Sequence, residues 1–175
     1  MKNIVMSTTI TCLACTGCVT GYSDVPTEQA GATVVFEKGY QKENASGNLV
    51  QGYIIYEDGN CNKARNAANF TGLHGDTKVR RVSTNTPLVF IAAINERDAP
   101  TVFVDGFAAT CSFKAEFQPR DGYKYRIRNS GTGTTCKVEV TDYETGTPVT
   151  DLKVEGAFKS DVESPRKNYL GYPCE

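Results

Sequence analysis

The amino-acid sequence predicts an all-β protein, an antiparallel β-sandwich of about seven to eight short strands. Short runs of β-branched and aromatic residues recur along the chain, and clusters of Gly, Pro, Asn and Asp separate them, which is the pattern of strands joined by turns. The composition agrees, because 16 glycines and 9 tyrosines accompany only 2 methionines and no tryptophan. A length of 175 residues indicates one domain with a core large enough to fold alone.

The candidate strands lie between turn signals. In chain order they are 33–36, 50–56, 78–82, 87–94, 101–104, 110–117, 123–128 and 135–140, with 152–154 as a further candidate. Residues 87–94 are the most hydrophobic stretch of the domain and predict a central strand buried on both faces. Residues 110–117 alternate apolar and polar side chains, which predicts one buried face. Residues 123–128 alternate in the same way, which predicts that Tyr123, Tyr125 and Ile127 point inward. Residues 78–82 contain two arginines, as is typical of an edge strand. The alanine-rich stretch 61–70 predicts a short helical turn.

One turn resembles a motif of a known fold family. Phe117-Gln118-Pro119 leads to Tyr123, and this arrangement is similar to the tyrosine corner of immunoglobulin-like and fibronectin-type folds. The resemblance covers about a dozen residues. It implies an immunoglobulin-like sandwich in which the hydroxyl of this tyrosine bonds back to the backbone. The absence of tryptophan removes one hallmark of true immunoglobulin domains.

The N-terminal residues have the layout of a secretory signal. Lys2 gives a basic start, a short apolar region follows, and the small residues Thr16-Gly17 lead into Cys18. This pattern resembles the signal of bacterial lipoproteins, in which a cysteine becomes the lipidated first residue. The resemblance implies that 1–17 is a signal peptide, that Cys18 carries the lipid and, because Val19 is not acidic, that the protein is anchored to the outer membrane. It does not decide between the periplasmic and the surface side.

The cysteine count favours Cys18 over Cys15, the alternative lipidation site. The chain has 7 cysteines, and with Cys18 as the lipid carrier 7 − 3 = 4 remain for the domain. With Cys15, five would remain and one thiol in an oxidising compartment would lack a partner. Plain secretion without a lipid is one competing interpretation, and a metal cluster of Cys12, Cys15 and Cys18 is the other. The cluster lacks a fourth ligand, because no His or Cys follows for more than forty residues.

Residues 18–31 are predicted to be a lipidated flexible tether in front of a domain spanning 32–175. The segment is polar, contains Gly21 and Pro26, and has no apolar period. Its boundary with the domain stays open, because packing of Tyr22 and Val25 on the domain is the alternative. An extended chain of about thirteen residues reaches about 45 Å at most, so the domain is expected to stay near the membrane.

The remaining cysteines are expected to form two disulfides. Four cysteines permit three pairings, which the sequence does not resolve. The favoured pairing joins Cys111 to Cys136, on the expected inward faces of two strands, and Cys61 to Cys174, which ties the C-terminal tail to the domain.

No pattern in the sequence indicates catalysis, a metal site or a cofactor. His74 is the single histidine, and no nucleophile motif or spaced ligand set accompanies it. The net charge of −1 gives no basic footprint for nucleic acid. The surplus of tyrosines predicts that some cap the sandwich with their hydroxyls in water, or alternatively that some form a binding surface.

The expected role is therefore non-enzymatic. The chain is predicted to be a membrane-anchored envelope interaction or assembly module with an envelope protein as its partner. The alternative is a surface-exposed or periplasmic binder, such as an adhesin or an inhibitor of a hydrolase, with the loop 129–134 reaching the partner. An enzyme, such as a hydrolase using His74, is a lesser alternative.

Overall fold

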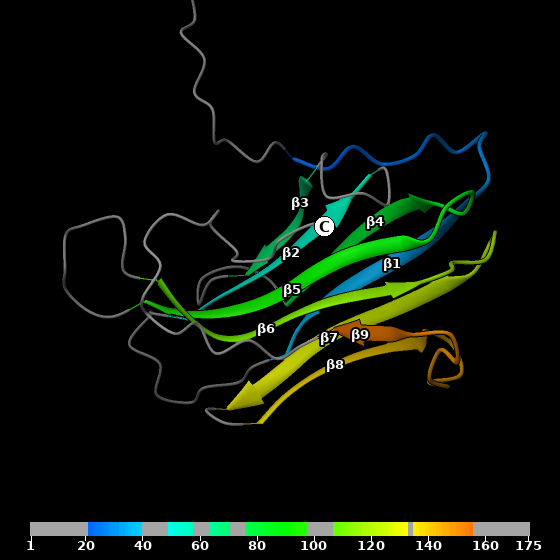
Figure 1. Cartoon of the computed structure of the whole chain (residues 1–175). Helices are drawn as coiled ribbons and strands as arrows, with labels where there is room; N and C mark the ends of the chain where they lie inside the picture. The colour runs from blue at the N-terminus through cyan, green and yellow to red at the C-terminus, as the bar shows by residue number, and fades with distance from the viewer. Residues whose placement is uncertain are drawn as a thin grey trace, which may run out of the picture.

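The computed structural model of this chain describes residues 21–39, 49–57, 64–70, 76–97, 107–132 and 135–155. These residues form strands and turns without a helix, so the predicted all-β class is confirmed for them (Figure 1). The strands are β1 (Gly31–Lys38), β2 (Leu49–Tyr56), β3 (Ala64–Phe70), β4 (Thr77–Ser83), β5 (Leu88–Arg97), β6 (Phe107–Phe117), β7 (Lys124–Thr132), β8 (Thr135–Asp142) and β9 (Lys153–Glu155). The expected strand 101–104 lies outside the described residues.

The strands form two sheets around one core, an arrangement consistent with a β-sandwich. The four-stranded sheet has the order β4-β1-β7-β8, and the five-stranded sheet has the order β3-β2-β5-β6-β9. Paired strands are antiparallel except β1 and β7, which are parallel. The strand β4 lies at an edge, as the arginines of 78–82 predicted. Aromatic side chains of both sheets fill the core, with Phe36, Tyr53, Phe70, Phe90 and Phe117 among its largest fully buried members.

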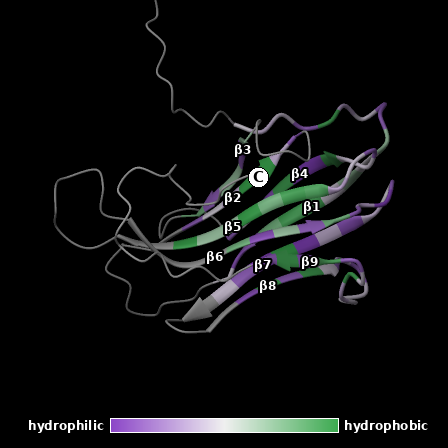
Figure 2. Cartoon of the chain, viewed as in Figure 1, coloured by the Kyte–Doolittle hydropathy of each residue, from purple (hydrophilic) through white to green (hydrophobic). Residues whose placement is uncertain are grey.

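The central strand of the five-stranded sheet is β5, and it is buried on both faces as predicted. Phe90 and Ala92 belong to the core between the sheets. Val89 and Ile91 point to the opposite face, where they are also buried and pack with Tyr56. Hydrophobic colouring runs along β5 in Figure 2. Burial on both faces explains why the sequence of this strand is a continuous run of apolar residues.

The predicted helical turn over 61–70 is wrong. Residues 64–70 form the strand β3, paired antiparallel with β2, and residues 61–63 lie outside the described residues. The register shifts between Tyr53 and Ile54, so that Tyr53 lies opposite Ala68 and Ile54 opposite Asn66. The extra residue, Ala67, forms a bulge, and both Ala67 and Ala68 are buried. The alanines gave a helical signal because alanine has a high intrinsic helix propensity. Pairing with β2 overrides that propensity and determines the conformation here.

The tyrosine that bonds back to the backbone is Tyr125, not Tyr123. The backbone N–H of Arg120 donates to the Tyr125 hydroxyl at 3.0 Å. The Tyr125 ring lies edge-on to Phe117 in the core, with 5.0 Å between the ring centroids. Tyr123 precedes β7 and is 45% exposed, so its expected inward position is also wrong. The turn ends on Gly122, which has a positive φ of 75°, and the alternation of inward side chains begins only after it.

A buried polar network joins the two sheets. The Tyr53 hydroxyl on β2 donates to the Glu37 carbonyl on β1 at 2.8 Å and accepts from the Asn129 N–H on β7 at 2.8 Å. The Gln51 amide nitrogen donates to the same hydroxyl at 2.7 Å and to the Asn129 carbonyl at 3.0 Å. The Gln51 side-chain oxygen accepts from the Gly39 N–H at 2.8 Å. A Cβ at Gly39 would meet the Asn129 carbonyl oxygen at 1.8 Å, so this close approach requires glycine.

The expected tether lies against the domain from Gly21 onward. Gly21 forms a bridge to Asn66 of β3, and the Tyr22 N–H donates to the Asn66 carbonyl at 2.9 Å. The Tyr22 side chain packs against the core, and the Val25 N–H donates to the Arg81 carbonyl of β4 at 3.0 Å. The structure therefore shows the packing of Tyr22 that the sequence left open, and residues 21–31 are held against the edge of the sandwich instead of forming a free tether.

The Tyr22 hydroxyl predicts a pH dependence of this contact. Burial, reinforced by the nearby Asp24 and Glu57 carboxylates, raises the pKa of Tyr22 from 10.0 to about 12. Since the folded state disfavours the ionised ring, the stability contributed by this group is complete below pH 10 and is lost as the pH rises from 10 to 12. We expect the free energy of unfolding of Tyr22→Phe, measured in urea, to rise relative to that of the unmodified protein as the pH increases from 10 to 12. A constant difference from pH 9 to 12 would contradict the prediction.

Candidate interaction surface

The residues that the sequence singled out as sites are placed only in part. Cys18, Cys61, His74 and Cys174 lie outside the described residues. The backbone of Cys111 lies on β6 opposite Ile94, and that of Cys136 lies on β8 opposite Gly131. The strands β6 and β8 belong to different sheets and contact each other, so the expected Cys111–Cys136 bridge would join the two sheets.

The expected disulfides remain a prediction with a direct chemical test. We expect Cys61, Cys111, Cys136 and Cys174 to resist alkylation in the unreduced, denatured protein and to be alkylated after reduction. Peptide mapping without reductant should recover the 111–136 and 61–174 pairs. Free thiols at Cys61 and Cys174 would contradict the tail linkage, and loss of each bridge would cost about 2–4 kcal/mol.

An open groove of about 320 Å³ lies at one end of the sandwich. One wall is the turn between β6 and β7, with Gln118, Arg120 and Tyr123. The other wall is the connection from β8 to β9, which contributes Thr145 and Asp151 among other polar residues. We call this feature the Tyr123 groove. Its lining combines two tyrosine rings, a guanidinium, two carboxylates and several hydroxyl groups.

The Tyr123 ring is supported on the protein side and reachable from solvent. It stacks on Tyr125 with 6.2 Å between the ring centroids and 21° between the ring planes. The guanidinium carbon of Arg120 lies 5.7 Å from the centroid of the Tyr123 ring. Because Tyr125 is itself fixed in the core, this stack orients an exposed ring that would otherwise turn freely.

The connection that forms the second wall is ordered by Asp142. Its carboxylate accepts bonds from the Thr145 N–H at 2.8 Å, the Thr145 hydroxyl at 3.0 Å and the Glu144 N–H at 3.0 Å. The bonds from Thr145 hold the pKa of Asp142 below its usual value. A carboxylate already ionised and occupied by backbone donors shapes the turn and is unsuited to proton transfer at neutral pH.

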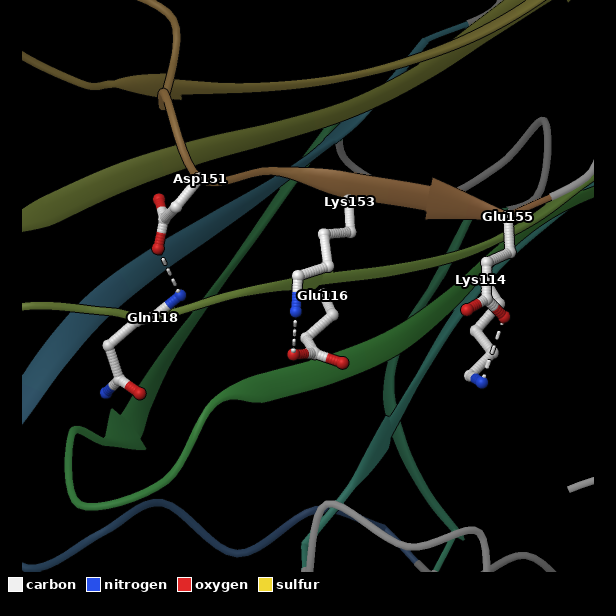
Figure 3. Close-up of polar contacts among 6 residues, drawn as sticks. All are labelled: Lys114, Glu116, Gln118, Asp151, Lys153 and Glu155. Atoms are coloured by element: carbon white, nitrogen blue, oxygen red, sulfur yellow. Dashed lines mark hydrogen bonds and ion pairs between the residues drawn. The ribbon is translucent and has the colours of Figure 1, made fainter. Parts of the chain in front are cut away.

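Polar contacts continue from the groove along the outer side of β6 and β9 (Figure 3). The Gln118 N–H donates to the Asp151 carboxylate at 2.9 Å. Lys153 pairs with Glu116 at 3.2 Å, and Glu155 pairs with Lys114 at 3.0 Å. These exposed pairs lie directly opposite each other in the register and contribute little stability individually. They accompany the pairing of the three-residue strand β9 with β6, and β9 follows directly after the second wall of the groove in the chain.

The sequence did not single out this groove. Of the tyrosines considered for a binding surface, Tyr53 and Tyr56 are buried and Tyr143 lies beneath the Lys124 ammonium, which is 3.7 Å from its ring centroid. Tyr123 was assigned to the core. The signal that marks it is the preceding Asp121-Gly122 turn, since a residue directly after such a turn need not follow the alternation of the strand.

The part of the chain that the structure describes contains no candidate metal site. No group of three or more His, Cys, Asp or Glu side chains within these residues could hold a metal ion. Within the same residues, no helix is long and apolar enough to cross a membrane. Comparison with known proteins identifies no matching family model and no similar curated protein.

Proposed function

We propose that this chain is a lipid-anchored protein of the bacterial outer membrane, with Cys18 as the lipid carrier, and that its β domain is a non-enzymatic interaction module. The lipid anchor is supported by the lipoprotein-like signal and by the cysteine count. The interaction role is supported by one observation above all, the half-exposed and oriented Tyr123 ring in an open groove.

We further propose that the sandwich is immunoglobulin-like. The backbone bond to the Tyr125 hydroxyl, five residues from its donor Arg120, supports this assignment because it reproduces the local contact of a tyrosine corner. Sandwiches of this kind present the loops at their two ends to partners. The Tyr123 groove lies at such an end.

The groove has the chemistry of a protein-binding surface. Tyrosine and arginine are enriched among the residues that dominate binding energy at protein interfaces, and Tyr123 and Arg120 are neighbours here. The stack on Tyr125 reduces the conformational entropy that Tyr123 would lose on binding. The surrounding hydroxyls and Gln118 supply adaptable hydrogen-bonding groups. We therefore assign an envelope protein as the partner.

Site-specific photocrosslinking in intact cells tests this proposal. A photoreactive amino acid at Tyr123 should give a discrete protein adduct. Val79 on β4 is the matched control, because it is an apolar side chain of similar exposure, 54%, that does not line the groove and lies on a strand separated from β7 by β1. The proposal fails if position 123 gives no protein adduct, or if positions 123 and 79 give the same adducts.

The captured partner allows a quantitative second step. Truncation of a dominant interface tyrosine costs about 2 kcal/mol, so Tyr123→Ala should weaken binding roughly thirty-fold. Val79→Ala should leave the affinity unchanged. The thermal midpoints of both variants should stay close to that of the unmodified protein, because both side chains are exposed.

A further inference from the structure

The N-terminal segment closes one edge of the sandwich. Residues 21–30 pass along β3 and β4, the edge strands of the two sheets that lie beside each other. Figure 1 shows this blue segment on the β3/β4 side of the molecule, with β8 and β9 on the opposite side. The first contact after Cys18 among the described residues is the bridge from Gly21 to Asn66 of β3.

The segment is held by contacts from both its backbone and its side chains. The Tyr22 hydroxyl donates to the Arg81 carbonyl at 3.2 Å. The Asp24 carboxylate accepts from the Arg81 N–H at 2.9 Å and pairs with Arg80 at 3.8 Å. The Arg81 guanidinium donates in turn to the Gln29 carbonyl at 2.7 Å. Arg80 also donates to the Ala67 carbonyl on β3 at 2.8 Å, which links the two edge strands beneath the segment.

These contacts shorten the connection between lipid and domain. The span from Cys18 to Gly21 is three residues, and an extended chain of that length reaches about 11 Å at most. We propose that the lipid on Cys18 holds the β3/β4 edge against the phospholipid headgroup surface and directs the β8/β9 edge away from it. This inference rests on the proposed lipidation of Cys18. A free tether of residues 18–31 would have allowed every orientation.

The orientation places the Tyr123 groove away from the bilayer. The groove is lined by the turn into β7 and by the chain between β8 and β9. Neighbouring strands are about 4.8 Å apart, so three spacings separate β4 from β8 by about 14 Å and four separate β3 from β9 by about 19 Å. A partner bound at the groove would then approach from the aqueous side, without contact with the headgroups.

Energy transfer to the membrane tests the orientation with two matched positions. Thr77 on β4 and Glu139 on β8 lie in one row of the four-stranded sheet, through Glu37 and Arg128, and occupy its two opposite edges. A fluorescent bioorthogonal residue is placed at one position or the other. The lipidated protein, purified from membranes, is reconstituted in vesicles of phosphatidylethanolamine and phosphatidylglycerol that contain a headgroup-labelled acceptor lipid. Transfer should be several-fold faster from position 77, because it falls steeply with height above the bilayer.

Two controls separate the orientation from the anchor. Inserting ten Gly/Ser residues between Thr20 and Gly21 should abolish the difference between the positions while vesicle binding persists. Asp24→Ala combined with Tyr22→Ala should reduce the difference for the same reason. Equal transfer from positions 77 and 139 in the protein without the insertion, with vesicle binding intact, would overturn the orientation alone. Failure of the purified protein to bind vesicles would overturn the lipid anchor and the orientation with it.

Discussion

Replacing Tyr53 by phenylalanine is expected to lower the free energy of unfolding by about 3 kcal/mol. The ring would still fill its place beside Phe36 and Phe70, where it makes aromatic contacts at 4.9 and 6.1 Å between centroids. The loss comes from the hydroxyl, which is fully buried and bonds Glu37, Gln51 and Asn129. Without it, the Asn129 N–H loses its acceptor in a site closed to water, and such a desolvated donor is costly.

Urea unfolding followed by circular dichroism measures this effect. Tyr123→Phe is the matched control, because it removes the same hydroxyl from a half-exposed ring and should change the free energy of unfolding by less than about 0.5 kcal/mol. If Tyr53→Phe were as stable as this control, the network joining β1, β2 and β7 would not hold the two sheets together as the structure indicates.

Phe90→Ala is expected to have the largest effect on stability, about 3–5 kcal/mol. Phe90 is fully buried in the middle of β5, the central strand of the five-stranded sheet, and lies opposite Ile55 and Ala115 on the flanking strands. Truncation leaves a cavity that these backbone-paired neighbours are poorly placed to fill. Val79→Ala, which shortens an exposed side chain, should have almost no effect.

The measurement is again the free energy of unfolding in urea. A loss of that size leaves a domain of this length near the limit of stability, so a lowered yield of folded Phe90→Ala is also expected. Phe90→Leu provides a milder variant that remains measurable. A cost below about 1 kcal/mol for Phe90→Ala would place Phe90 outside the core.

The sequence predicts the strands whose side-chain pattern is determined locally. The run around Phe90 and the alternation that ends at Phe117 both identify strands, because burial on two faces or one leaves a direct trace in the order of residues. The strand β3 was missed because its conformation depends on pairing with β2 and on the bulge at Ala67. Such pairing is a property of the assembled sheet and leaves no local trace in an alanine-rich stretch.

The candidate surface was harder to predict for the same reason. Tyr123 and Tyr125 are two residues apart and would share a face in a regular strand, yet one is exposed and the other is buried. Only the turn at Gly122, which places Tyr123 before the strand begins, separates them. The sequence left open whether Tyr22 packs on the domain, because its docking onto β3 and β4 depends on contacts 44 and 59 residues away, with Asn66 and Arg81.

Lipidation of Cys18 is the central claim, and metabolic labelling with a fatty-acid analogue tests it most directly. The unmodified chain and Cys15→Ser should both incorporate the label and sediment with membranes. Cys18→Ser should incorporate none and should not sediment with membranes. Label retained in Cys18→Ser and lost in Cys15→Ser would move the anchor to Cys15, and absence of label from the unmodified chain would contradict the lipoprotein assignment.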